Sequence, residues 1–122
     1  MKSHKNLDVW RIPVKLAEEV YGVTRRFPKD ELFRLTTQMR RSAISIPSNI
    51  ADGAARQGDK EFVQFLYVAA GSASELDTQL EIAKRVPIGD PQDLERLQSE
   101  VERISMMLQG LIRSVRRGSV RT

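Results

Sequence analysis

Residues 38–53, QMRRSAISIPSNIADG, place a proline in the middle of a segment that otherwise has the pattern of a helix. Pro47 has no backbone N–H to donate to the carbonyl oxygen of Ala43, and this defect costs about 3 kcal/mol unless packing offsets it. The polar side chains around it can hydrogen-bond backbone groups that a bend exposes. These side chains are Ser42, Ser45, Ser48 and Asn49. The segment therefore predicts a helix kinked at Pro47.

Helical periodicity extends outward from this segment, and we expect the kinked helix to cover about residues 30–54 with Asp30 as its N-cap. Its predicted core stripe consists of Leu32, Leu35, Met39, Ala43, Ile46 and Ile50. The preceding helix, over about residues 6–26, repeats apolar residues at Trp10, Val14, Ala17 and Tyr21. These two stripes predict two helices that are packed on each other.

Two longer helices follow, over about residues 59–86 and 91–117. Asp59 can cap the first of them, and Asp90 with Pro91 forms a good start for the second. The predicted stripes are Phe62, Leu66, Ala69, Ala73, Leu76, Leu80 and Ala83, and then Leu94, Leu97, Val101, Ile104, Leu108, Leu111 and Val115. Short connections favour an antiparallel up-and-down four-helix bundle. We expect one all-α domain over residues 1–122, with a basic tail at 118–122.

Composition excludes several function classes. The chain of 122 residues contains no cysteine and a single histidine, His4, so it offers no thiolate metal site and no parts for a Ser-His-Asp device. Phosphate-loop and dinucleotide motifs are absent. We therefore expect no enzyme activity, no cofactor and no metal. The lack of cysteine and of long apolar runs favours a soluble protein of the reducing cytoplasm with no membrane partner.

Basic residues are unevenly distributed along the chain, whose net charge is +4. Residues 110–122 contain four arginines and no acid, whereas residues 61–109 contain nine acidic and four basic residues. The arginines form two candidate phosphate-binding sets, Arg34, Arg40 and Arg41, and then Arg113, Arg116, Arg117 and Arg121. Two structural alternatives stay open. The second set can stabilise a helix macrodipole, and Arg40 and Arg41 can pair with acids of a neighbouring subunit.

The helices predicted over residues 30–54 and 59–86 have more apolar side chains than the interior of one bundle can bury. Phe33, Ile44, Pro47 and Ala51 lie off the core stripe of their helix, and residues 62–70, which include Val63 and Tyr67, are apolar nearly all round. We expect these six residues to form an oligomer interface. The alternative is a thick single-chain core. Trp10, Tyr21, Phe62 and Tyr67 fall on or beside the apolar stripes, so we expect them to pack in the core and not to stack on bases.

Specific sequence strings carry a resemblance to a known family. They are Arg40-Arg41, Ser45 to Ala51 with Gly53, Leu7 to Trp10, Lys60 to Phe62, Phe65 to Tyr67, Gly71-Ser72, Ser74 to Leu76 and Thr78 to Leu80. Nearly the whole chain resembles the 23S ribosomal RNA intervening-sequence proteins, which are small bacterial four-helix bundles. Asp52 stands where glutamate is usual, and Pro13 interrupts the first helix.

The resemblance implies a pentameric ring, as in related bundles such as the accessory proteins of diversity-generating retroelements, and RNA as the ligand. The first hypothesis is therefore a non-enzymatic ring that binds RNA through basic surfaces with a steep salt dependence. The alternative is a protein-interaction scaffold that docks a nucleic-acid enzyme such as a reverse transcriptase and does not itself bind RNA.

Overall fold

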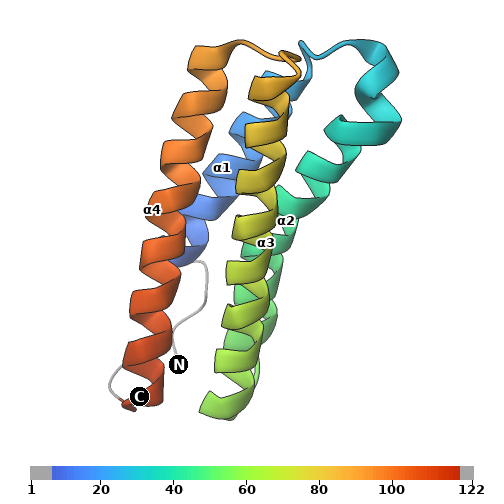
Figure 1. Ribbon diagram of the computed structural model, residues 1–122. Coiled ribbons are helices and arrows are strands. Elements are labelled where there is room, and N and C mark those ends of the chain that lie inside the picture. The colour runs from blue at the N-terminus through green and yellow to red at the C-terminus, as the bar shows by residue number, and fades with distance from the viewer. Residues whose placement is uncertain (1–6, 119–122) are drawn as a thin grey trace.

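The computed structural model describes residues 7–118 and folds them into four long helices without a strand (Figure 1). They are α1 (Asp8–Thr24), α2 (Thr37–Ala54), α3 (Asp59–Arg85) and α4 (Pro91–Arg116). Successive helices are antiparallel, and α1 also contacts α4, which closes the bundle. The predicted four-helix bundle is confirmed.

The helix α1 is much shorter than α3 and α4, and this difference opens one end of the bundle. Its 17 residues span about 26 Å, whereas the 27 residues of α3 span about 40 Å. In Figure 1 the first turn of α1 lies near mid-height, and α3 and α4 extend beyond it at the lower end. Among the described residues, α1 therefore does not cover the lower ends of α3 and α4.

The predicted stripes of the last two helices are confirmed with one exception. All seven stripe residues of α3 are buried, and in α4 the buried stripe passes through Ile112 instead of Leu111, which is only partly buried. A straight helix drifts by about 20° per heptad relative to an exact seven-residue repeat, so the buried face moves by one residue towards the end. The start of α4 is as predicted, because the Asp90 carboxylate accepts a hydrogen bond from the Gln92 amide at 2.8 Å.

The stripe predicted for the first helix is wrong. The residues buried in α1 are Pro13, Leu16, Val20, Val23 and Thr24, whereas Trp10, Ala17 and Tyr21 are only partly buried and Val14 is 39% exposed. The helix has two apolar stripes, and the one rich in branched aliphatic residues faces the core. Pro13 does not interrupt the helix, which continues to Thr24.

The start predicted for the second helix is also wrong. Asp30 caps no α-helix, because Lys29–Glu31 forms a 3-10 turn and Leu32–Thr36 forms a π-helical segment before α2 begins at Thr37. The hydroxyl of Thr37 donates to the Leu32 carbonyl, which supports this wide turn. Leu32 is consequently 41% exposed and lies outside the core. Asp59, predicted as a cap, is instead the first residue of α3 and follows Gly58.

Pro47 lies inside α2 and is buried within the single chain, although the sequence placed it off the core stripe. The Asn49 side chain donates to the Ser45 carbonyl at 2.8 Å and so bonds the backbone beside the proline. The serines act differently from the prediction, because Ser45 bonds Ser72 at 2.8 Å and Ser42 donates to Glu75 at 3.0 Å, both on α3. These polar contacts connect α2 to α3.

Candidate nucleic-acid interface

The two predicted sets of arginines lie at opposite ends of the bundle. Arg34, Arg40 and Arg41 lie near the start of α2, at the top of Figure 1, whereas the last turn of α4 lies at the bottom. The 26 residues of α4 alone span about 39 Å. The structure therefore separates the arginines into two surfaces within one chain. Arg121 lies outside the described residues.

The arginines near the start of α2 differ in the burial of their side chains and in the contacts that these side chains make within the chain. Arg40 is partly buried, its Nε donates to the Thr24 hydroxyl at 2.9 Å, and its guanidinium lies 4.5 Å from the centre of the Tyr21 ring. These contacts join α2 to α1, so Arg40 has a structural role within the chain. Arg34 and Arg41 are exposed and remain candidates for binding phosphate.

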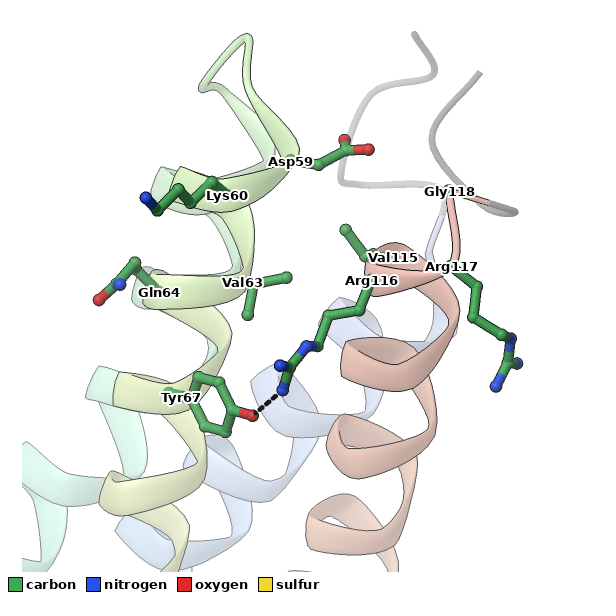
Figure 2. Close-up of a pocket in the computed structure, with 9 residues that line it drawn as sticks. All are labelled: Asp59, Lys60, Val63, Gln64, Tyr67, Val115, Arg116, Arg117 and Gly118. Carbon is green, nitrogen blue, oxygen red and sulfur yellow. Dashed lines mark hydrogen bonds between the residues drawn. The ribbon is translucent and has the colours of Figure 1, made fainter.

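The lower end of the bundle contains a groove of about 590 Å³ between α3 and α4 (Figure 2). Its lining includes Asp59, Lys60, Val63, Gln64 and Tyr67 from α3, and Val115, Arg116, Arg117 and Gly118 from the end of α4. Figure 2 shows the Arg116 side chain reaching towards α3, where its Nη1 donates to the Tyr67 hydroxyl at 2.9 Å. Arg117 extends away from α3. The shortness of α1 leaves this groove uncovered by that helix.

The basic side chains of this groove form no ion pair within the described structure. Within residues 7–118, no carboxylate lies within 4.0 Å of the charged nitrogens of Lys60, Arg113, Arg116 or Arg117. Elsewhere on the surface, basic side chains do pair with acids. Asp59 is the carboxylate among the described lining residues. Three basic residues line the groove and Arg113 lies one helical turn away on α4, which makes this end of the described structure a candidate site for anions.

A second groove, of about 380 Å³, lies between α1 and α2 and is mainly apolar. Its lining consists of Trp10, Val14, Ala17, Ile44, Pro47, Ser48 and Ala51. The α1 residues that do not enter the core thus form one wall of this groove.

The six residues predicted to form an oligomer interface are divided among three places. Ile44, Pro47 and Ala51 line the apolar groove, whereas Val63 and Tyr67 line the basic groove. Phe33 lies in the π-helical segment and is 88% exposed. Tyr67 is 46% exposed, so the prediction that it packs in the core is wrong. Its ring faces the groove because position 67 lies off the buried stripe of α3.

Sequence reasoning missed Lys60 and Gln64 as groove residues. With Tyr67 they follow the spacing i, i+4 and i+7, which places all three on one side of a helix, so this signal was available.

Within residues 7–118 there is no group of three or more acidic, histidine or cysteine side chains that could hold a metal. In the same range no helix has the length and apolarity required to cross a membrane.

Fold and surface together define a small antiparallel four-helix-bundle protein with a basic groove at one end. Its structure is similar to a crystal structure from Bacteroides thetaiotaomicron, described as a protein of unknown function from the S23 ribosomal protein family. The TM-score is 0.77 at 21% identity, over 85% of this chain and 97% of that one, so the likeness shows the fold. The model of the 23S rRNA-intervening sequence protein family matches residues 5–110, and the chain belongs to this family. No curated protein matches the chain.

Proposed function

We propose that this protein is a non-enzymatic, cytoplasmic homo-oligomer that binds RNA through basic surfaces. The observation that carries the proposal is the lower groove, which Lys60, Arg116 and Arg117 line without a carboxylate within ion-pair distance of their charged nitrogens in the described structure. Arginine suits phosphate because its planar guanidinium donates parallel hydrogen bonds. Membership of a family named for the intervening sequences of 23S rRNA makes RNA the first ligand to test.

Assembly would strengthen such binding. The apolar groove between α1 and α2 and the exposed ring of Phe33 are unpartnered apolar surface of the kind that subunit contacts cover. A ring, for which we propose five subunits, repeats each basic groove around its axis. Several weak phosphate contacts then act together on one RNA and raise the overall affinity without a strong individual site.

The test is binding of the purified protein to a labelled structured RNA across a salt series, with light scattering of the same samples for mass. Binding should weaken steeply with salt, because neutralised phosphates release counterions. The variant Arg116→Gln/Arg117→Gln should bind more weakly and show a shallower slope, by about 0.7 to 0.9 for each phosphate that is no longer neutralised. Binding that does not change between low and moderate salt would contradict the proposed mechanism.

The matched control removes the same charge from another surface. A small groove between α1 and α4 is lined by Lys15, Arg96 and Arg103 together with Glu19 and Glu100. Arg96 pairs with Glu19 and Arg103 with Glu100, so most of the basic charge there is already paired. The variant Lys15→Gln/Arg103→Gln should keep the RNA affinity and the salt slope of the original protein. If this control weakens binding as much as the Arg116/Arg117 variant does, net charge and not the groove determines the affinity.

A second candidate function is a protein-interaction scaffold that docks a nucleic-acid enzyme such as a reverse transcriptase. The apolar groove lined by Trp10, Ile44 and Pro47 supports it, because such surface suits an apolar side chain of a partner. On this hypothesis the isolated ring binds no RNA. The variant Ile44→Glu should then abolish partner binding measured by calorimetry, while Arg116→Gln/Arg117→Gln should preserve it.

A further inference from the structure

Tyr67 differs from most aromatic residues of the described structure in having an accessible ring. Phe27 and Phe62 are buried in the core. Tyr21 and Phe65 are each faced by a guanidinium, at 4.5 Å from Arg40 and 4.8 Å from Arg56 respectively. Trp10 is partly buried in the apolar groove. Phe33 and Tyr67 are the aromatic residues of residues 7–118 that are more than a third exposed, and only Tyr67 lines the basic groove.

Arg116 is positioned to hold an anion next to the Tyr67 ring. Its Nη1 donates to the Tyr67 hydroxyl at 2.9 Å, and this bond keeps the guanidinium at the edge of the ring (Figure 2). A guanidinium has five N–H donors, so four remain after this contact. No described carboxylate lies within ion-pair distance to occupy them. An aromatic face and a partly unused guanidinium are therefore held side by side.

The groove is open to solvent, and its volume of about 590 Å³ is comparable to that of a small-molecule site, so it can hold about one or two nucleotides. Double-stranded RNA is instead bound across successive grooves over about 16 base pairs, by contacts spread along the helix, and its bases are stacked on one another. Unpaired strands are bound by basic grooves with aromatic side chains on which single bases stack.

We infer that the α3–α4 groove recognises an unpaired nucleotide, whose base stacks on Tyr67 while Arg116 holds a neighbouring phosphate. Lys60 and Arg117, at the two sides of the groove, attract the flanking phosphates. The inference rests on the RNA binding proposed above and specifies the form of RNA that this site takes. Because stacking requires only a base with an accessible face, the groove prefers loops and single strands over duplexes without reading a particular sequence.

The experiment compares an unpaired RNA of about 10 nucleotides with a duplex of about 16 base pairs, both measured by fluorescence anisotropy at equal salt. The proteins are the original chain, Tyr67→Phe, Tyr67→Leu and Phe33→Leu. Tyr67→Phe keeps the ring and loses the hydroxyl, whereas Tyr67→Leu keeps apolar bulk and loses the ring. Phe33→Leu is the matched control, since it removes the other exposed ring, which does not line the basic groove.

The original protein should bind the unpaired RNA more tightly than the duplex. Tyr67→Leu should weaken binding of the unpaired RNA by about 5- to 100-fold and leave duplex binding unchanged, because one base no longer has a ring on which to stack. Phe33→Leu should stay within about 3-fold of the original protein. Tyr67→Phe keeps the ring but loses the bond that positions Arg116, so its affinity should fall by less than that of Tyr67→Leu. A 2-aminopurine placed in the unpaired RNA should be quenched on binding to the original protein and to Tyr67→Phe, but not to Tyr67→Leu.

Other results would overturn the inference in distinguishable ways. Equal, salt-dependent binding of both RNAs that Tyr67→Leu does not alter would refute base stacking while leaving the proposed RNA binding intact. If neither RNA binds, the proposed function fails, and the inference fails with it. If Tyr67→Leu lowers the oligomer mass together with the RNA affinity, Tyr67 is a subunit contact and the assignment of a stacking role is wrong.

Discussion

Replacing Gly53 by alanine would test how closely α2 approaches α3. A Cβ atom at position 53 would lie 2.7 Å from the Cβ of Phe65 and 3.0 Å from Cδ1 of Phe62. The Cβ of Phe65 is fixed to the backbone, so it cannot move aside by a change of rotamer, and the two helices must separate instead. Gly71, exposed in the middle of α3, provides the control because a Cβ there meets nothing within 4 Å.

The magnitude follows from two opposing effects. Alanine in place of glycine stabilises a helix interior by about 0.5 to 1 kcal/mol, and Gly71→Ala should show this gain. At Gly53 the gain is opposed by overpacking, which costs about 1 to 3 kcal/mol. Gly53→Ala should therefore lower the free energy of unfolding by up to about 2 kcal/mol. Helix propensity largely cancels between the two variants, so their difference of about 1 to 3 kcal/mol measures the close contact.

The assay is a urea titration followed by far-UV circular dichroism. Protein concentration must be the same for all variants, because assembly makes apparent stability depend on concentration. The stability change is read from the transition midpoint when the slope is unchanged. We expect the midpoint to fall for Gly53→Ala and to rise for Gly71→Ala. A rise of equal size for both variants would refute the close approach of α2 and α3 at Gly53.

Three further predictions concern single side chains. Asp90→Ala should destabilise the protein by about 1 kcal/mol by removing the N-cap of α4, and Asp90→Asn should restore most of this in thermal melts. Pro47→Ala should straighten α2 and weaken assembly, and an unchanged oligomer mass and melting temperature would contradict this. The hydrogen bond from Arg85, followed by that from Gln98, lowers the pKa of Glu81 below its ordinary value of 4.5. The ionised Glu81 carboxylate therefore stabilises the fold above pH 4.5, and this stabilisation is lost as pH falls through the lower folded-state pKa. The variant Glu81→Gln should consequently lose less stability on acidification than the original protein, as measured by thermal melts at neutral and acidic pH.

The parts of the fold that the sequence predicted correctly are those where one apolar stripe stands alone. The stripes of α3 and α4 each define a single buried face, so periodicity was sufficient. In α1, Trp10, Val14 and Ala17 compete with Leu16, Val20 and Val23. Periodicity predicts a helix in either case, but the choice of face depends on the neighbouring helices. The irregular turns at residues 29–36 were missed because their residues also fit a regular helix.

The basic groove could be predicted only in part. The spacing of Lys60, Gln64 and Tyr67 places them on one side of α3, and the arginines at the end of α4 are evident in the sequence. The contact between Tyr67 and Arg116 joins residues that are 49 positions apart. It depends on the register of the two antiparallel helices, which is determined by how the buried stripes interlock. The opening of the groove further depends on the length of α1.

Stabilisation of a helix end is the strongest structural explanation for the arginines of α4, and the structure limits how much it accounts for. Cations in the last turn of a helix interact favourably with the partial negative charge of the unpaired carbonyls, by about 0.3 to 1 kcal/mol each. This effect alone could explain Arg113 and Arg117, which are exposed near that end. Arg116 instead points away from its own helix axis and bonds a tyrosine of α3. The hydrogen bond to Tyr67 accounts for this direction, which the dipole alone does not. It also leaves four guanidinium N–H donors for the phosphate that we propose.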